Sequence, residues 1–234
     1  MASKPKVLIV LSSHDKMGDT GKPTGWYLPE FAHPYNVLEP HAEISIASPA
    51  GGEAPLDPSS VEMFKEDKPS VDFLNTQSAL WKNTEKLSSF LGRSNDFAAI
   101  FYVGGHGPMF DLANDPTSVL LLHEFAEANK VISAVCHGPA AFVNAKTAKG
   151  THLLADVAVT GFSNAEEDGV GLSAAMPFSL EDELQKASGG RFEKAAEPWG
   201  EKVVVAKGGR LITGQNPASA SGVGKAILQA IQAH

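Results

Sequence analysis

Cys136 is the single cysteine in this chain of 234 residues, and its surroundings are typical of a reactive thiol. It lies in "VISAVCHGPAAF", residues 131–142, where an apolar strand is expected to end and a helix to begin at Gly138-Pro139. Backbone amides at a helix N-terminus carry partial positive charge, which favours a thiolate. A sharp turn here would push the side chain out of the sheet, as in the nucleophile elbow of hydrolases. A buried structural thiol is the alternative interpretation.

A second segment with possible chemistry is "YVGGHG", residues 102–107, which ends another apolar, strand-like run. Its glycines expose backbone N–H groups, and such groups can stabilise a developing oxyanion. Ligands bind at the carboxyl ends of the strands in open α/β sheets, so these two strand ends would share one edge of the sheet. Taken alone, Gly-Gly-His-Gly is equally compatible with an ordinary turn.

The group that transfers protons must be sought among few residues. After His152 the chain offers only His234, so a histidine well downstream of the cysteine is nearly excluded as the base. His137, His106 or a carboxylate remain. Glu30 lies in the apolar stretch "WYLPEFAHP", where desolvation would raise its pKa and suit it to shuttling a proton. The alternative for Glu30 is a helix-start glutamate favoured by the macrodipole.

Two acidic residues follow a further expected strand. Glu166 and Glu167 stand in "GFSNAEEDG", and one of them could orient His137. A solvated acidic turn is the alternative for both.

The composition limits the class of protein. Hydrophobic residues make up 43% and charged residues 20%, as in ordinary globular domains. The formal net charge is -8, so the protein lacks the basic surface that is typical of nucleic-acid binders. The same negative charge disfavours binding to anionic membranes. One cysteine rules out an internal disulfide, which fits a reducing compartment. The apolar run at residues 7–11 is too short for a signal-peptide core, so we expect no membrane association and a cytoplasmic location.

Strand-like and helix-like segments alternate along the chain, which predicts an α/β fold with a mostly parallel sheet between helix layers. We expect a single domain over residues 1–234, with insertions at about 53–75 and 162–200. The first of these insertions reads as a long irregular piece. The expected strands lie near residues 6–13, 42–48, 97–103, 131–135 and 156–162, with two more around a Lys-Gly-Gly turn within 202–214. The expected helices lie near 28–38, 76–94, 115–130, 138–150, 176–190 and 216–232.

Seven segments together resemble the ThiJ/PfpI superfamily, and more narrowly its glutathione-independent glyoxalase III branch, whose fungal members are also described as heat-inducible chaperones. In chain order, from about residue 5 to 232, they are "VLIVLSS", "GWYLPEFAHPY", "YVGGHGPMFDL", "AVCHGPAAF", "VTGFSNAEE", "MPFSLEDEL" and "LITGQNPASA". The resemblance implies a flavodoxin-like three-layer sandwich, similar to class I glutamine amidotransferases, and a homodimer.

The resemblance also implies roles for individual residues. Cys136 would be the nucleophile, His137 its partner, Glu30 the acid/base residue and Glu167 the third member of the triad, with Glu166 as the alternative for that position. The backbone amides of Gly105 and His106 would bind the oxyanion. No cofactor and no metal are implied.

The expected activity is conversion of a small dicarbonyl, methylglyoxal or glyoxal, with water to D-lactate or its analogue. Such an enzyme is a lyase of the hydro-lyase type and serves a stress response. A holding chaperone with an apolar patch near residues 53–75 or 172–180 would not need Cys136. A protein deglycase would use the same thiol, and redox sensing would be a side effect. Glutaminase activity is not expected, because Ala134 replaces the glycine of those domains and their distant His-x-Glu is missing.

Overall fold

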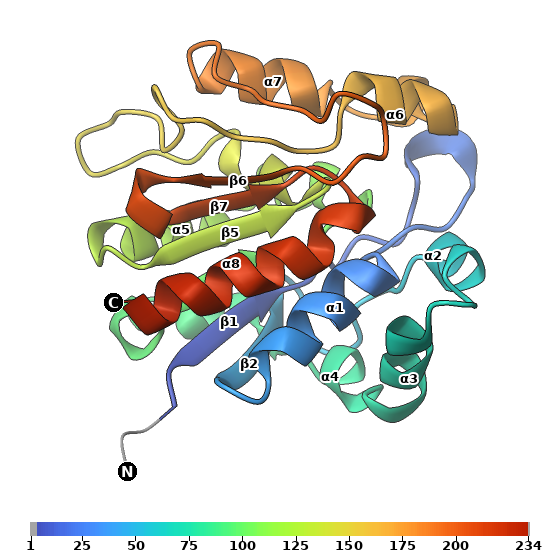
Figure 1. The fold of residues 1–234 in the computed structure, drawn as a ribbon, viewed down its shortest axis with the longest axis horizontal. Coiled ribbons are helices and arrows are strands. Elements are labelled where there is room, and N and C mark those ends of the chain that lie inside the picture. The colour runs from blue at the N-terminus through green and yellow to red at the C-terminus, as the bar shows by residue number, and fades with distance from the viewer. Residues whose placement is uncertain (1–3, 234) are drawn as a thin grey trace.

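The structure, a computed structural model, describes residues 4–233. Its seven strands form one sheet in the order β3-β2-β1-β4-β5-β7-β6 (Figure 1). All neighbouring pairs are parallel except β6 and β7. The strands are β1 Lys6–Val10, β2 Glu43–Ser48, β3 Glu85–Lys86, β4 Ala99–Tyr102, β5 Val131–Val135, β6 Val203–Ala206 and β7 Leu211–Gly214.

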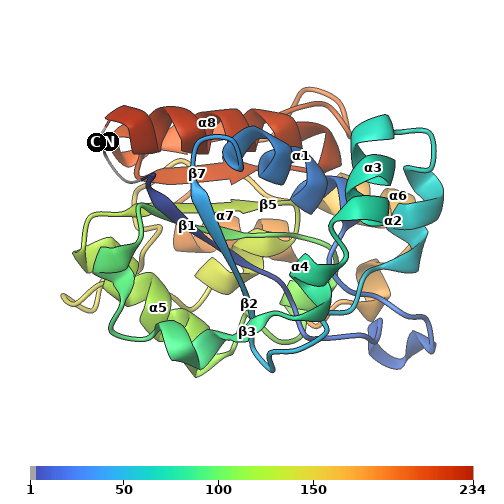
Figure 2. The same ribbon diagram turned by 90° about the horizontal axis from the view of Figure 1, so that it is seen from below.

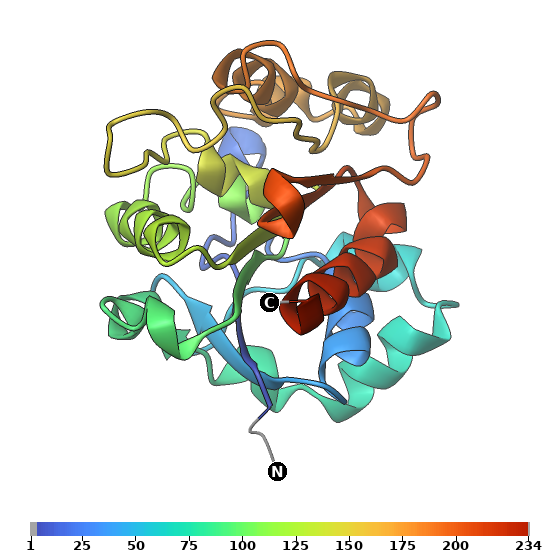
Figure 3. The ribbon, with the colours of Figure 1, turned by 60° about the vertical axis from the view of Figure 1, so that its left-hand side comes forward.

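Helices cover both faces of this sheet. Helices α1 and α8 lie on one face, with α3 beside α1, and α5 lies on the other face (Figure 2). Helices α6 and α7 form a separate cap near the β6–β7 edge, at the top of Figure 3. This arrangement is the predicted flavodoxin-like three-layer sandwich. The helices are α1 Leu28–Leu38, α2 Pro58–Met63, α3 Lys68–Thr76, α4 Ala79–Lys82, α5 Pro116–Glu127, α6 Asn164–Val170, α7 Leu180–Ala187 and α8 Ala220–Ala233.

Local sequence explains the central elements. Strands β4 and β5 are buried along their whole length, and β1 is buried from Val7 onward, as expected for parallel strands covered on both faces. The Asp115 side chain accepts hydrogen bonds from the N–H groups of residues 117 and 118, and Pro116 occupies the first turn of α5. Asn216 caps the C-terminal helical segment in the same way, so both predicted helix starts are confirmed.

Two predicted helices are wrong. Residues 76–94 form α4, the short strand β3 and a 3₁₀ helix, because Thr84 bonds to the Gly52 carbonyl (2.7 Å) and to Ser48 (2.7 Å), which ties this segment to the end of β2. Residues 138–150 form only a 3₁₀ helix, Gly138–Phe142, and turns. That helix is completely buried and lacks the polar face of an ordinary surface helix, so its course follows packing rather than helix propensity.

Two further expectations need correction. Residues 53–75 are not an irregular piece, because they contain α2 and most of α3, capped by the side chains of Asp57 and Asp67. Residues 156–162 make no regular strand and share a single bridge, Val159 with Phe192. The place beside β5 is already taken by β7, so the segment bonds across the strand ends instead, with the Phe162 N–H donating to the Cys136 carbonyl.

The topology brings the candidate residues to one edge. Strand β1 leads to β2 on one side, while β4 and β5 lie on its other side, which makes a topological switch point between β1 and β4. The carboxyl ends of β4 and β5, side by side in register, are followed by the Gly-Gly-His and Cys-His segments. Within residues 4–233 no helix has the length and apolar character needed to cross a membrane.

Candidate active site

Cys136 occupies a strained turn directly after β5. Its φ is 61°, in the left-handed region that costs a non-glycine residue about 1 kcal/mol. The Cys136 N–H donates to the Gly214 carbonyl (2.9 Å), and the Cys136 carbonyl accepts from the Phe162 N–H (2.9 Å). Bonds on both sides therefore hold the strained backbone in place, and the expected elbow-like turn is present.

The ionisation of Cys136 differs from the sequence-based expectation. The side chain is only 4% exposed, and its pKa is raised well above the ordinary value, first by burial and then by the neighbouring Glu30. The Gly105 backbone amide opposes this shift. The expectation that this position would favour the thiolate is wrong, because burial and the neighbouring Glu30 favour the protonated thiol.

Glu30 lies in the first turn of α1 and is fully buried. Neither carboxyl oxygen has a partner at full hydrogen-bond geometry within residues 4–233. Burial raises the pKa of Glu30 well above its ordinary value, and contacts with the Cys136 thiol and the Gly104 amide offset part of this shift. The thiol and the carboxyl therefore both favour their protonated forms, and a thiolate forms as a neighbouring group accepts the proton.

His137 is the neighbouring group best placed to accept that proton. Its Nδ1 lies 3.4 Å from the Cys136 Sγ, and its Nε2 lies 2.5 Å from the Oε2 of Glu167. Since the carboxylate can only accept, the proton of a neutral ring belongs on Nε2, and Nδ1 presents its lone pair to sulfur. Burial, followed by the charge of His106, lowers the pKa of His137 to about 4, so the ring is neutral at neutral pH.

Glu167 links two histidines. Its Oε1 accepts a hydrogen bond from the Nε2 of His106 at 2.8 Å, while its Oε2 accepts from His137. Burial alone would raise the pKa of Glu167, but the two histidines together hold it well below its usual range. Glu167 is therefore a carboxylate that can stabilise positive charge on His137.

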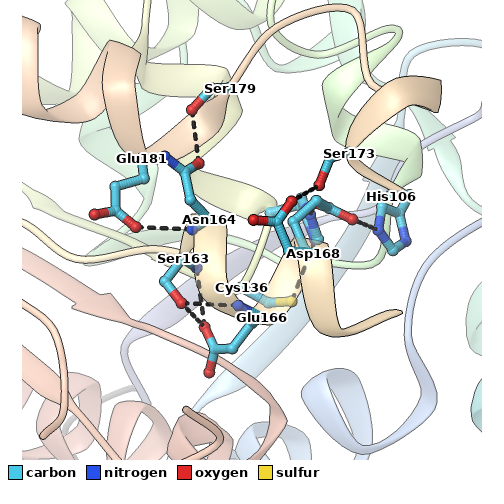
Figure 4. Close-up of polar contacts among 11 residues, drawn as sticks. His106, Cys136, Ser163, Asn164, Glu166, Asp168, Ser173, Ser179 and Glu181 are labelled. Atoms are coloured by element: carbon cyan, nitrogen blue, oxygen red, sulfur yellow. Dashed lines mark hydrogen bonds and ion pairs between the residues drawn. The ribbon is translucent and has the colours of Figure 1, made fainter. Parts of the chain in front are cut away.

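The neighbouring Glu166 has a different task. Its Oε2 accepts from the N–H (2.9 Å) and hydroxyl (2.7 Å) of Ser163 in a capping box at the start of α6. Its Oε1 accepts from the Trp199 N–H (2.9 Å) and from the Asn216 side chain (2.8 Å). Figure 4 shows the Glu166 carboxylate directed at Ser163, away from His106. Glu167 is thus the residue that contacts His137, and Glu166 ties three chain segments together.

The glycines after β4 allow this close assembly. A methyl group on Gly104 would lie 2.3 Å from the Glu30 Oε2 and 2.8 Å from the Cys136 Cβ, too close for any side chain. Gly105 has a φ of 93°, which glycine adopts readily. A hydrogen bond from its backbone amide lowers the pKa of the Cys136 thiol. An oxyanion formed on a carbon bonded to that sulfur would therefore lie near this N–H group.

A cavity of about 280 Å³ opens over these groups. Its floor includes Gly105, His106, Cys136 and His137, so the candidate nucleophile faces an accessible space. Its walls carry mainly apolar side chains, namely Met17, Tyr27, Met63, Phe162, Val170, Leu172 and Trp199.

The structure also shows which residues could hold a metal ion. Within the described chain, one ligand atom each from His106, His137 and Glu167 lie within 4.8 Å of one another. In this structure the same atoms are engaged in hydrogen bonds with one another. A metal ion bound there would replace the contacts that orient His137.

The structure brings the predicted site residues together and shows two features that sequence reasoning missed. His106 was expected to contribute its backbone amide, whereas its side chain also holds Glu167. Phe162 and Trp199 were not singled out, although the Phe162 ring lies 4.4 Å from that of His137 and 5.5 Å from that of Trp199. The histidine in "GGHG" was a usable signal, but no sequence pattern indicates which distant aromatic residue covers a buried histidine.

The fold and site together define a flavodoxin-like α/β protein with a cysteine at an elbow beside a buried glutamate. A family model for the DJ-1/PfpI family matches residues 30–230. The chain belongs to this family.

Individual relatives agree with this assignment. Glyoxalase 3 of Candida albicans is 32% identical over 97% of this chain and 98% of its own length. A crystal structure of glyoxalase III from Candida albicans is 30% identical and superposes with a TM-score of 0.84 over 98% of each chain. Glutathione-independent glyoxalase HSP31 of Saccharomyces cerevisiae is 27% identical over 99% of this chain and its full length. Rapid Encystment Protein 24 KDa of Francisella tularensis is 39% identical, with a TM-score of 0.88 over 97% of this chain and 99% of its own.

Proposed function

We propose that this protein is a glutathione-independent glyoxalase that converts methylglyoxal and water to D-lactate. The observation that carries the proposal is the buried pair of Cys136 and Glu30 at an elbow that opens into a cavity. Relatives over the full length of the chain bear the glyoxalase name. The reaction class would be that of a hydro-lyase of the D-lactate dehydratase type.

The first step joins sulfur to the aldehyde carbon. His137 accepts the thiol proton at Nδ1, and its positive charge is stabilised by Glu167. The sulfur adds to C1, and the former carbonyl oxygen takes the proton of Glu30, which gives a hemithioacetal and leaves Glu30 as a carboxylate. The Gly105 and His106 amides would stabilise the oxyanion before it is protonated.

The second step moves hydrogen between the two substrate carbons. Glu30, now a carboxylate, removes the proton on C1 while His137 returns its proton to the oxygen on C2, which gives an enediol. The Glu30 carboxyl then delivers a proton to C2 and takes up the proton of the C1 hydroxyl, which leaves the thioester and a neutral His137. C1 is oxidised to a thioester while C2 is reduced to an alcohol, so no external oxidant or reductant takes part. Water then attacks the thioester, with His137 as base, which releases lactate and restores the thiol.

The raised pKa of Glu30 fits this cycle. A carboxyl that burial keeps protonated can give up a proton and take one back, which an exposed glutamate with its ordinary pKa does poorly. The dry surroundings that raise this pKa also keep water away from the enediol.

The first prediction tests this function. Wild-type protein incubated with methylglyoxal in glutathione-free buffer should form D-lactate, measured by a chiral lactate assay. Cys136→Ala should lower the rate by at least about 100-fold, because no other thiol exists in the chain. Leu120→Ala, an exposed residue on α5, is the matched control and should keep the wild-type rate. Equal rates in wild type and Cys136→Ala would refute the assignment of Cys136 as the nucleophile.

A holding chaperone is the second candidate function, favoured by one observation: Met63, in the segment where a chaperone patch was expected, is 66% exposed. Suppression of aggregation of a heated client protein should be measured beside the lactate assay. Suppression that persists in Cys136→Ala would assign chaperoning to a surface independent of the thiol. A protein deglycase, by contrast, would lose its activity together with Cys136.

Three further expectations from the sequence are also part of the proposal. The protein would act as a homodimer in the cytoplasm, on dicarbonyls as small as glyoxal. Sedimentation velocity of the purified full chain would show twice the mass expected from 234 residues if the dimer forms.

A further inference from the structure

The cavity above Cys136 lies beside a second one. The neighbouring cavity, of about 420 Å³, shares four lining residues with it: Tyr27, Met63, Trp199 and Pro217. The second cavity also contacts the middle of α1 at His33 and the start of α3 at Asp67. We call the four shared residues the apolar gate. These residues therefore stand where the two cavities meet.

The mouth of this space exposes apolar surface to an unusual degree. Five large hydrophobic side chains are exposed among residues 4–233, and three of them, Met63 (66%), Trp199 (44%) and Val170 (40%), line the active-site cavity. Exposed apolar groups that gather around a concave site mark a binding surface more often than chance placement does.

Two of the gate residues make defined contacts. The backbone N–H of Trp199 donates to the Glu166 carboxylate at 2.9 Å, and this residue has a φ of 66°, a strained value for tryptophan. The hydroxyl of Tyr27 lies 3.2 Å from the Sδ of Met63. Backbone strain that the surrounding contacts sustain is a property of functional positions. The gate is therefore a built feature rather than a set of loose surface residues.

A three-carbon substrate leaves this surface unused. Methylglyoxal has only five non-hydrogen atoms, and at about 30 Å³ each, the volume of a liquid water molecule, they fill about 150 Å³. The active-site cavity alone measures about 280 Å³. With the aldehyde carbon at the Cys136 sulfur, the substituent on the ketone carbon is the only part of a 2-oxoaldehyde that can extend toward the gate.

We propose that the apolar gate is a subsite for the substituent of bulky 2-oxoaldehydes, with aryl or long alkyl groups. This inference rests on the proposed glyoxalase function and names its substrate class. The chemistry is unchanged: the sulfur adds to the aldehyde carbon, one hydrogen moves from C1 to C2, and water releases the 2-hydroxy acid. The product of phenylglyoxal is mandelate, and that of 2-oxoheptanal is 2-hydroxyheptanoate, so no oxidant or reductant is consumed.

The test compares three substrates in the full-length protein. The specificity constants kcat/KM for methylglyoxal, phenylglyoxal and 2-oxoheptanal are measured by product formation. We expect the wild type to favour at least one bulky probe over methylglyoxal by about 10-fold. In Trp199→Ala and Met63→Ala this ratio should fall by about 10-fold, since the subsite loses contact surface. The ratio, rather than the absolute rate, cancels differences in folding between variants.

Control variants and opposing outcomes make the result decisive. Leu120→Ala and Val205→Ala also remove exposed apolar side chains but lie outside both cavities, and they should leave the ratio unchanged. If methylglyoxal is converted and the gate variants lower kcat/KM equally for all three substrates, the subsite is refuted while the glyoxalase function stands. If the gate variants change only the sedimentation coefficient, the gate is an interface between copies and the proposal fails. If no 2-oxoaldehyde is converted by the wild type, the function fails and the subsite with it.

Discussion

At the scale of single residues, the pair of Cys136 and Glu30 combines chemistry with a cost in stability. Both groups are buried, and both have pKa values raised by that burial. A buried carboxyl that prefers to stay protonated opposes folding at any pH where the unfolded chain would ionise it. The site therefore makes the folded protein less stable at alkaline pH than its other contacts would allow.

The second prediction follows from this linkage. Above the ordinary pKa of 4.5, Glu30 loses its proton in the unfolded chain but keeps it in the folded one. The free energy of unfolding then falls as pH rises, by about 1.4 kcal/mol per pH unit, until the raised pKa is reached. Glu30→Gln has no proton to lose, so its stability relative to wild type should grow from pH 5 upward.

Urea denaturation at several pH values measures this effect. The matched control is Glu66→Gln, at an exposed glutamate. The difference in free energy of unfolding between this variant and wild type should be constant with pH. A difference between Glu30→Gln and wild type that does not vary with pH would contradict the assigned ionisation of Glu30.

The third prediction concerns His106 as a positioning residue. His106→Phe removes one of the two hydrogen bonds that hold Glu167 ionised, so the pKa of Glu167 should rise. A hydrogen bond to a charged group contributes about 1.5–3 kcal/mol, so kcat should drop by about 10-fold or more, with a smaller change in KM. The acid limb of the kcat profile should also move to higher pH.

His106→Gln is the control for this prediction, because its amide nitrogen can take the place of Nε2. It should restore most of kcat and return the acid limb toward its wild-type position. An acid limb that stays fixed in His106→Phe would assign His106 a purely structural role.

At the scale of elements, the site depends on how closely the segment after β4 approaches α1 and the elbow. Gly104 fills the only space between the Glu30 carboxyl, the Val135 carbonyl and Cys136. A side chain there must displace one of these groups, and two of them belong to the proposed reaction centre.

The fourth prediction compares two glycines. Gly104→Ala should destabilise the protein by about 1–3 kcal/mol and abolish activity, because the added methyl group overlaps Glu30 and Cys136. Gly169→Ala, in α6, meets nothing within 4 Å and should be neutral or stabilise by up to about 1 kcal/mol. Chemical denaturation and the lactate assay measure both. A Gly104→Ala variant with normal activity would mean that the segment after β4 is free to shift.

The sequence predicted those elements whose signals are local. Apolar runs gave the strands that lead to residues 104 and 136, and helix-capping residues gave the starts of α5 and the C-terminal helical segment. The resemblance supplied the roles proposed for Cys136, His137 and Glu30. The predictions for residues 76–94, 138–150 and 156–162 were wrong, because partners distant in sequence decide the conformation of these segments. The raised thiol pKa was missed for the same reason, since burial is a property of the whole fold.

At the scale of the whole molecule, two parts of the chain have separate tasks. The sheet edge provides the floor of the cavity, with the elbow and the segment after β4. The regions expected as insertions, 53–75 and 162–200, provide much of the wall, including Met63, Phe162 and Trp199. Changes in the wall can therefore alter which molecules enter, while the reacting groups stay fixed on the strands.

The three tryptophans of the chain are distributed in a way that has a spectroscopic consequence. Trp26 and Trp81 are buried with rings 5.2 Å apart, whereas Trp199 stands in the mouth of the site. Their fluorescence should separate into a blue emission from the buried pair and a redder emission from Trp199. Acrylamide should quench the redder part alone, and Trp199→Phe should abolish it. The protein thus contains an intrinsic fluorescent reporter, and binding of a ligand in the mouth of the site can be followed by the fluorescence of Trp199.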